Sequence, residues 1–313
     1  MFTIKQPNKI IFGKNTVKDF KFDENPLIIT TNGAVKRNWI KYLKINQFHL
    51  FDNVEPNPSI ETVEKIISGF QKKQISYIIG LGGGSVLDVA KYVAFKMKKK
   101  KIMIPTNFGS GSEVTRISVL KVNGKKKSFH DDRIFADVSI LDSFFLEKIP
   151  QQIFKNSVID ACAQCTEAYD SKKSNSYTKF LCKSAFDKLE EGIIENDNEK
   201  IVFGSLLTGL GFGNSSTTLG HALSYVYSNE GIAHGHALAF TTNAAHKFNN
   251  SLFKERFLNL VNILDFEEIN LKENLENAAV LILTDKKHLD NNPKKISKQE
   301  IVKLLQNINL NQI

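Results

Sequence analysis

Short apolar runs alternate with amphipathic segments through the first half of the chain. The apolar residues of 60–70 recur at helical spacing behind Ser59, which predicts a helix capped by that serine. A second helix is predicted over 86–95. Three apolar runs predict buried strands: Leu27–Thr30, Ile75–Ile79 and Lys101–Ile104. Strands that alternate with helices predict a parallel sheet covered on both faces.

The pattern changes near Pro150, after which helical periodicity dominates. We therefore predict two domains: an α/β dinucleotide-binding domain over residues 1–150 and an all-helical domain over residues 151–313. Near the end of the chain, Ser297 and Glu300 have the spacing of a capping box that starts a last helix. The polar stretch 288–295 before it is predicted to be a loop.

The composition indicates a globular protein with a normal core, because 42% of its 313 residues are hydrophobic and 24% are charged. No apolar run approaches the roughly 20 residues that span a bilayer, and the first residues lack the apolar segment of a signal peptide. Three cysteines, an odd number, favour a reducing compartment. We expect a cytoplasmic protein with no membrane association. Cys162 and Cys165 have no second Cys-x-x-Cys to complete a zinc site, so we interpret them as buried small hydrophobes.

The net charge of +9 leaves the partner open. The lysines are spread along the chain, which is typical of a solvated surface, although such a surface also attracts an acidic substrate. No zinc-finger spacing, aromatic RNA-binding motif or basic amphipathic stripe accompanies the charge. A nucleic-acid partner is therefore not expected.

A glycine-rich turn carries the first candidate chemistry. Gly82-Gly83-Gly84-Ser85 follows a predicted strand and opens a predicted helix. Glycines allow close approach of the backbone to a pyrophosphate, and the helix N-terminus directs free N–H groups at the anion. A second loop rich in small donors, residues 105–113, follows the next strand. At the carboxyl edge of a parallel sheet the two loops would face the same crevice.

These segments together resemble the iron-containing alcohol dehydrogenases. Residues 82–91 match the family's GGGSxxDxxK motif, and residues 105–115 match its P-T-x-x-G-[ST]-G-S-E-x-T segment. Further similarity, in colinear order, lies at residues 140–150, at Asp160 to Tyr169 and at His221 to Ala237. The resemblance implies an aldehyde reductase that uses NADPH or NADH, with a divalent metal and hydride transfer in the cleft between an α/β and an all-helical domain. Two alternatives are a dehydroquinate synthase-like or glycerol-phosphate dehydrogenase-like enzyme, and a nucleotide-binding member that has lost catalysis.

The resemblance also implies a metal site for Fe²⁺ or Zn²⁺. Imidazoles with one carboxylate suit these metals and leave a position for substrate. Asp160 and His234 match family ligands, whereas Gln164 stands where most members have histidine. His221 aligns with a histidine beside the nicotinamide, and Thr217 stands at a usual ligand position. We expect Asp160, Gln164, His221 and His234 to hold the metal, with Asp160, His221 and His234 as catalytic residues.

Residues at the cofactor follow from the same resemblance. They are Gly82, Gly83, Gly84, Ser85, Asp88, Thr106, Asn107, Ser110, Lys126 and Thr31. Members that prefer NAD tend to carry an aspartate where this chain has Thr31, with Lys36 and Arg37 nearby. Without that carboxylate the 2′-phosphate of NADPH is not repelled.

Gln164 and the two histidine segments resemble the branch that contains phosphonoacetaldehyde reductases, enzymes of phosphonate metabolism. A small anionic aldehyde is therefore the expected substrate, which a basic protein would suit. The 67 residues after His246 form a shorter helical tail than the family usually carries. We expect a pared-down pocket or one completed by a partner subunit, as in a homodimer.

Overall fold

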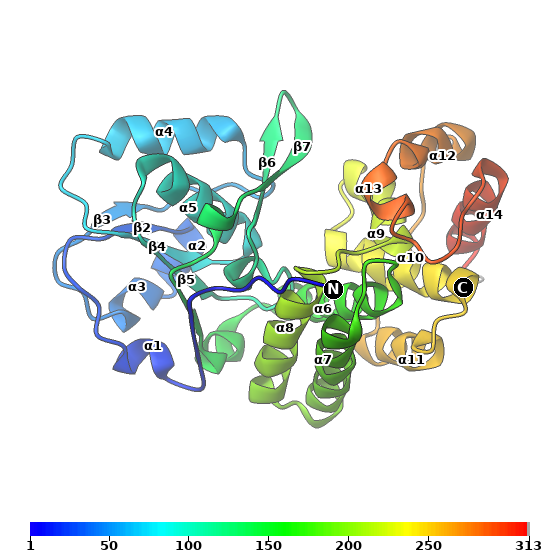
Figure 1. Cartoon of the computed structure of the whole chain (residues 1–313), viewed down its shortest axis with the longest axis horizontal. Coiled ribbons are helices and arrows are strands. Elements are labelled where there is room, and N and C mark those ends of the chain that lie inside the picture. The colour runs from blue at the N-terminus through cyan, green and yellow to red at the C-terminus, as the bar shows by residue number, and fades with distance from the viewer. Residues whose placement is uncertain (312–313) are drawn as a thin grey trace. The chain divides into compact units, whose positions relative to one another are not determined.

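The computed structural model of the protein describes residues 1–311 and contains two compact units. The α/β unit comprises Ile4–Ile149, and the helical unit comprises Met1–Thr3 and the residues from Pro150 onward. Figure 1 shows the elements of each unit. The predicted fold class, a parallel-sheet α/β domain followed by a helical one, is confirmed.

The α/β unit is built on a six-stranded parallel sheet in the order β1-β8-β5-β4-β2-β3. The central strands β2, β4 and β5 are buried throughout, as expected for a sheet covered on both faces. An antiparallel hairpin adds two more strands. The strand bounds are β1 (Lys9–Phe12), β2 (Leu27–Ile29), β3 (His49–Phe51), β4 (Ile78–Gly82), β5 (Lys101–Pro105), β6 (Ile117–Val122), β7 (Lys125–His130) and β8 (Val138–Leu141).

Two long helices pack on this sheet as predicted. Ser59 caps α4, since its hydroxyl accepts a hydrogen bond from the Thr62 amide at 3.3 Å. Val63 and Ile66 of α4 join the core cluster formed by α5 and the sheet. The helices and 3-10 turns are α1 (Thr16–Asp19), α2 (Asn32–Lys36), α3 (Trp39–Tyr42), α4 (Ile60–Phe70), α5 (Gly84–Met97), η1 (Ser112–Val114), η2 (Asp132–Ile134) and η3 (Ser143–Lys148).

Strand β4 lies three residues further along than predicted. It begins at Ile78 and continues through Gly80 and Gly82, which pair with Met103 and Pro105 of β5. A Cβ on Gly80 would lie 2.8 Å from the Cβ of Ala90 on α5. The glycine is therefore part of the strand because it lets the helix approach the sheet, whereas glycine usually marks the end of a strand.

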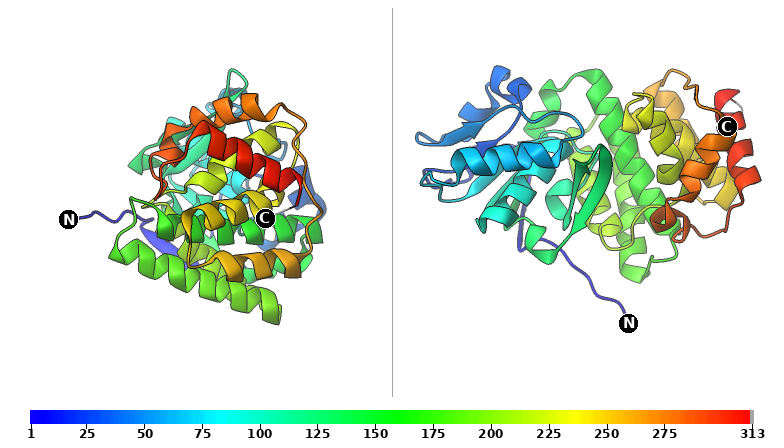
Figure 2. Two further views of the ribbon diagram at one scale, coloured as in Figure 1. Left: turned by 90° about the vertical axis from the view of Figure 1, so that its right-hand side faces the viewer. Right: turned by 90° about the horizontal axis from the view of Figure 1, so that it is seen from above.

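The helical unit contains α6 (Gln151–Asp170), α7 (Ser176–Glu195), α8 (Asn198–Phe212), α9 (Leu219–Asn229), α10 (His234–Asn249), α11 (Lys254–Leu264), α12 (Leu275–Leu283), α13 (Lys286–Leu289) and α14 (Lys298–Asn309). Helices α6, α7 and α8 lie side by side in Figure 2, and α10 packs on α6 and α9. Cys162 and Cys165 are fully buried on α6, where burial raises the pKa of Cys165 to about 12. Their interpretation as small hydrophobes is confirmed. None of the helices in residues 1–311 is long and apolar enough to cross a bilayer.

The end of the chain is predicted correctly at α14, and the polar stretch before it is a loop as predicted from residue 290 onward, whereas His288 and Leu289 belong to α13. Ser297 and Glu300 form the predicted capping box. His288, placed by the sequence in a polar loop, is buried on the short helix α13. Asn291 and Asn292 are also buried, and their side chains bond the backbone of the 215–219 segment. The side chains of Asn291 and Asn292 thus satisfy buried backbone groups, whereas Asp290 and Lys295 of the same polar stretch are exposed.

Candidate metal centre and nucleotide cradle

One face of helix α6 carries three of the polar side chains of the candidate metal centre. Asp160, Gln164 and Glu167 are spaced by four and three residues, which places them above one another on a helix. Gln164 and Glu167 are buried, while the side chain of Asp160 is 14% exposed. The face therefore runs from a buried carboxylate to a partly accessible one.

Glycine at position 235 brings His234 to this face. His234 is the first residue of α10, and a Cβ on Gly235 would lie 2.0 Å from the carbonyl oxygen of Asn156 on α6. Any side chain at Gly235 would push the start of α10 away from α6. The His-Gly pair thus combines a ligand-type side chain with the close backbone approach that positions it.

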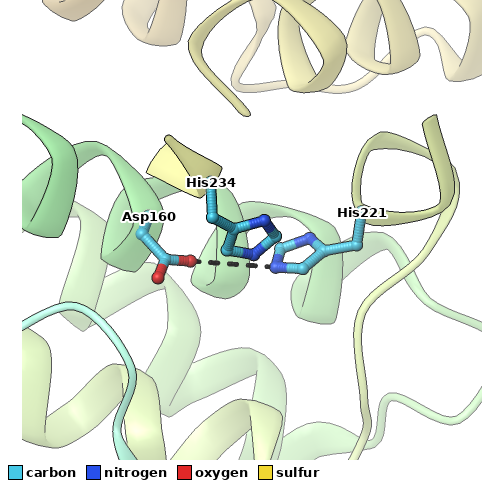
Figure 3. A group of neighbouring side chains, drawn as sticks. All are labelled: Asp160, His221 and His234. Carbon is cyan, nitrogen blue, oxygen red and sulfur yellow. Dashed lines mark ion pairs between the residues drawn. The ribbon is translucent and has the colours of Figure 1, made fainter. Parts of the chain in front are cut away.

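Asp160, His221 and His234 form a cluster whose potential ligand atoms all lie within 4.8 Å of one another (Figure 3). His221 Nε2 lies 3.8 Å from Asp160 Oδ1, and the two imidazole rings are 5.5 Å apart. Ligands bound to one metal at about 2.1 Å lie roughly 3–4 Å apart, so small adjustments would suffice. These three predicted ligands are brought together; that they bind a metal stays a prediction.

Gln164, the fourth predicted ligand, contacts the cluster through its amide nitrogen. Its Nε2 donates a hydrogen bond to Asp160 Oδ1 at 2.8 Å. Its Oε1 is buried with no hydrogen-bond partner in the described chain. An amide nitrogen cannot ligate a cation, so ligation by Gln164 requires rotation of the amide. In this conformation Gln164 orients the Asp160 carboxylate.

His221 is held from behind by Glu167. His221 Nδ1 lies 3.0 Å from Glu167 Oε1, and both side chains are buried. Burial alone would raise the pKa of Glu167, but the charge of His221 and the hydrogen bonds from His221 and Thr218 outweigh it and lower that pKa to about 2. Burial lowers the pKa of His221, but the charge and hydrogen bond of Glu167 together with the charge of Asp160 outweigh it, so the pKa is raised overall. Glu167 is therefore an ionised partner of His221.

The residues of the predicted nucleotide cradle lie in the α/β unit at the carboxyl ends of three neighbouring strands. Thr31 follows β2, Gly83 and Gly84 follow β4, and the 106–110 loop follows β5. A Cβ on Gly83 would lie 2.5 Å from the amide nitrogen of Asn107, and one on Gly84 would lie 2.7 Å from Ser110 Oγ. The two predicted loops are therefore adjacent. Gly83 is the N-cap of α5, so the start of this helix has no side-chain cap.

Asp88 has a structural role beside its predicted one. Its Oδ1 accepts a hydrogen bond from Ser112 Oγ at 2.6 Å, and its Oδ2 accepts one from the Val119 amide at 3.0 Å. The buried Lys91, 3.5 Å from the same carboxylate, donates to the carbonyl oxygen of Ser112 at 2.7 Å. Asp88 and Lys91 thus fasten the second loop to α5, and a direct contact of Asp88 with the cofactor stays a prediction.

Two of the predicted cofactor residues, Thr31 and Lys126, lie apart from the glycine turn in sequence and element. Thr31 caps α2, since its hydroxyl accepts a hydrogen bond from the Ala34 amide at 3.4 Å. Lys126 is exposed on β7 of the hairpin, in register with Lys121. Both stay predictions as cofactor contacts.

Comparison with known proteins decides the family. A family described as iron-containing alcohol dehydrogenase matches residues 7–143, and the C-terminal part of the same family matches residues 155–280. Together they cover most of the chain. The chain belongs to the iron-containing alcohol dehydrogenase family.

Other family members resemble it over part of their length. A 4-hydroxybutyrate dehydrogenase of Clostridium kluyveri is 34% identical over 209 residues, which are 58% of this chain and 56% of the relative. A long-chain-alcohol dehydrogenase of Geobacillus thermodenitrificans is 32% identical over 221 residues, 61% of this chain and 56% of the relative. The chain thus spans little more than half the length of these curated relatives.

Solved structures with the family's fold cover nearly all of the chain. A sulfoacetaldehyde reductase from Bifidobacterium kashiwanohense, in complex with NAD⁺, superposes with a TM-score of 0.90 at 22% identity and covers 99% of each chain. An alcohol dehydrogenase from Oenococcus oeni superposes with a TM-score of 0.88 at 21% identity, covering 98% of this chain and 100% of the other. At this identity the likeness establishes the fold.

Beyond the family match, α13 and its N-cap bring two residues to the candidate metal centre that the sequence did not reveal, His288 and Asp285. His288 stacks on His221 at 6.2 Å between ring centroids and lies edge-on to Tyr225 at 5.8 Å. Its Nδ1 lies 2.6 Å from Asp285 Oδ2. Tyr225 in turn stacks on His234 at 6.1 Å. Both imidazoles of the cluster are therefore faced by an aromatic side chain; the Asp285-x-x-His288 spacing was the available signal, hidden by the expectation of a loop.

The second loop also contains a buried carboxyl group, that of Glu113. Burial raises the pKa of Glu113 to about 7 from 4.5, and its Oε1 has no hydrogen-bond partner in the described chain. Between these values the folded state binds more protons than the unfolded state, so stability falls as pH rises. Glu113→Gln should abolish this dependence and stabilise the protein at alkaline pH by up to about 3 kcal/mol, because a pKa difference of one corresponds to about 1.4 kcal/mol.

Thermal unfolding midpoints at mildly acidic and mildly alkaline pH would measure the effect. Glu61, exposed on α4, offers the control Glu61→Gln. We expect the midpoint difference between Glu113→Gln and wild type to grow with pH, and no such trend for the control. A constant difference would show that Glu113 is ionised in the folded protein throughout.

Proposed function

We propose that this protein is an NAD(P)-dependent aldehyde reductase whose metal is held by Asp160, His221 and His234. The observation that carries the proposal is the convergence of these three side chains from α6, α9 and α10. Folding alone gives no reason to bring two imidazoles and a carboxylate from three separate helices to one point. The α/β unit, residues 1–150, would bind the dinucleotide, and residues 151–313 would bind metal and substrate.

The donor set fits a divalent cation. One carboxylate and two imidazoles suit Fe²⁺ or Zn²⁺, and a fourth position is left for Gln164 or for substrate. The buried and unpartnered Oε1 of Gln164 is an acceptor that a cation nearby would satisfy after rotation of the amide. A cation bound there would act as a Lewis acid on the oxygen of an aldehyde.

The chain's own residues have defined tasks in this proposal. Glu167 keeps His221 in place, and Gln164 orients Asp160. Gly83 and Gly84 leave space for the pyrophosphate at the start of α5, where the N–H groups of the helix meet the anion. Thr31 stands in place of a carboxylate after β2, so both NADH and NADPH are accepted as hydride donors.

A small anionic aldehyde is the substrate class that we favour. The branch resemblance at Gln164 indicates a phosphonate-bearing aldehyde, and one structural neighbour is named for sulfoacetaldehyde, which bears a sulfonate. The net charge of +9 would attract either anion. Phosphonoacetaldehyde is the specific candidate, with a sugar or glycerol phosphate as the alternative.

Metal content and turnover of the purified chain test this function. We expect near-stoichiometric iron or zinc, and oxidation of NADPH or NADH that is faster with phosphonoacetaldehyde than with uncharged butyraldehyde. A chelator should abolish turnover, and Fe²⁺ or Zn²⁺ should restore it. Bound nucleotide without metal or turnover would instead identify a member that has lost catalysis, and turnover of glycerol phosphate alone would identify the alternative substrate.

A further inference from the structure

Glu167 lies behind the candidate metal centre and bonds residues at the start of α9 and on α10, although it is not itself a candidate ligand. We propose that Glu167 is a positioning residue. It keeps His221 in the tautomer with the proton on Nδ1, so that the unprotonated Nε2 can bind the metal. The inference rests on the proposed function, because it concerns the presentation of a ligand to that metal.

The geometry defines which imidazole nitrogen carries the proton. His221 Nδ1 lies 3.0 Å from Glu167 Oε1, and His221 Nε2 lies 3.8 Å from Asp160 Oδ1. Thr218 and Thr242 donate hydrogen bonds to both oxygens of this carboxylate, which therefore acts as an acceptor at Oε1 as well, and His221 Nδ1 is the donor. A neutral imidazole then has its lone pair on Nε2, the nitrogen that faces Asp160. Carboxylates hold metal-binding histidines in this way in many proteins.

The Glu167 carboxylate is itself fixed from two other helices. Its Oε2 accepts hydrogen bonds from the amide of Thr218, at the start of α9, at 2.6 Å and from the Thr218 hydroxyl at 2.8 Å. Its Oε1 accepts one from the hydroxyl of Thr242 on α10 at 3.3 Å. Only 2% of the side chain is exposed. The carboxylate therefore cannot turn to water, and the position of His221 follows from α6, α9 and α10 together.

Glycine at position 220 makes room for this arrangement. A Cβ there would lie 2.3 Å from Glu167 Oε1 and 2.9 Å from the Cα of Thr242. Neither neighbour can move without breaking a hydrogen bond of the carboxylate. The residue before His221 therefore has to be glycine, because a side chain there would collide with the Glu167 carboxylate. Gly220 and Gly235 thus both leave space that the candidate metal centre requires.

A purely structural role for Glu167 makes a different prediction. Its contact with the Thr218 amide at the start of α9 could serve only to cap that helix. In that case a neutral isostere would lower stability but leave metal affinity unchanged. Metal affinity and the His221 tautomer distinguish the two roles, since capping alone changes neither.

The experiment is metal titration of the full-length Glu167→Gln variant, stripped of metal and titrated with Co²⁺ or Zn²⁺. We expect a loss of affinity of about 10–100-fold relative to wild type. Histidine ring ¹H–¹⁵N spectra of the metal-free proteins, recorded at alkaline pH where the imidazoles are neutral, should show Nδ1 of His221 protonated in wild type and a mixture of tautomers in the variant. Glu190→Gln is the matched control, because Glu190 lies on α7 and is paired with Arg256 on α11; this variant should bind metal as wild type does.

Thr242→Val keeps the carboxylate and removes one of its donors, which guards against a Glu167 variant that fails to fold. It should fold and lose several-fold in metal affinity. Wild-type metal affinity in both Glu167→Gln and Thr242→Val, with an unchanged His221 tautomer, would overturn the positioning role. Failure of the wild-type protein itself to bind Co²⁺ or Zn²⁺ would overturn the proposed function instead, so the two failures are distinguishable.

Discussion

His234→Ala is expected to lose bound metal and to lower aldehyde turnover by roughly a thousand-fold. Removal of one imidazole leaves only Asp160 and His221 as protein ligands in the cluster. Lewis-acid stabilisation by a bound metal is worth several kcal/mol, and each 1.4 kcal/mol corresponds to about tenfold in rate. The fold should survive, because His234 is only partly buried at the first position of α10.

His236→Ala is the matched control for this prediction. His236 lies two residues later in the same helical turn, but its Nε2 contacts the carbonyl oxygen of Glu267 outside the cluster. Metal content by elemental analysis and turnover with each nicotinamide cofactor measure both variants. Retention of metal and turnover by His234→Ala, or their equal loss in His236→Ala, would show that the cluster is not the metal site.

The fold class was predictable because it depends on local periodicity. Apolar runs predict strands β2 and β5, and apolar residues at helical spacing predict the helix that follows Ser59. Residues of all three elements lie in the same core cluster. The end of β4 was misplaced because Gly80 and Gly82 belong to the strand. Their lack of a side chain serves packing against α5 and Met103, which a local pattern does not encode.

The candidate metal centre was predictable only through family motifs. The face of α6 that carries Asp160 and Gln164 follows from helical spacing alone. The approach of His234 depends on the contact of Gly235 with Asn156, and the orientation of His221 depends on Glu167. Such contacts between distant segments have no periodicity, so spacing cannot reveal them.

His288 shows that local composition also fails to identify a buried polar side chain. Its neighbours in sequence are polar, which predicts a loop, yet Asp285 and the packing on His221 and Tyr225 bury it. A polar segment and a buried polar network have the same composition. Only the partners that satisfy the polar groups distinguish them.

Gly84→Ala is expected to weaken NAD(P)H binding by at least an order of magnitude. The new Cβ would lie 2.7 Å from Oγ and 2.8 Å from Cβ of Ser110, and the latter cannot rotate away. The second loop must therefore shift from the start of α5, which separates the two sets of donors that would hold the pyrophosphate. Fluorescence titration with NADPH and NADH measures the loss, and metal content should be unchanged because the metal ligands lie in the other unit.

Gly69→Ala supplies the matched control within the same unit. Gly69 is on α4, where a Cβ would meet no atom within 4 Å. Because alanine is favoured over glycine in a helix by up to about 1 kcal/mol, this variant should be slightly more stable and bind nucleotide as wild type does. Unchanged affinity in Gly84→Ala would mean that the nucleotide does not use the start of α5. A loss limited to that variant would identify the close approach of the two loops as the source of binding.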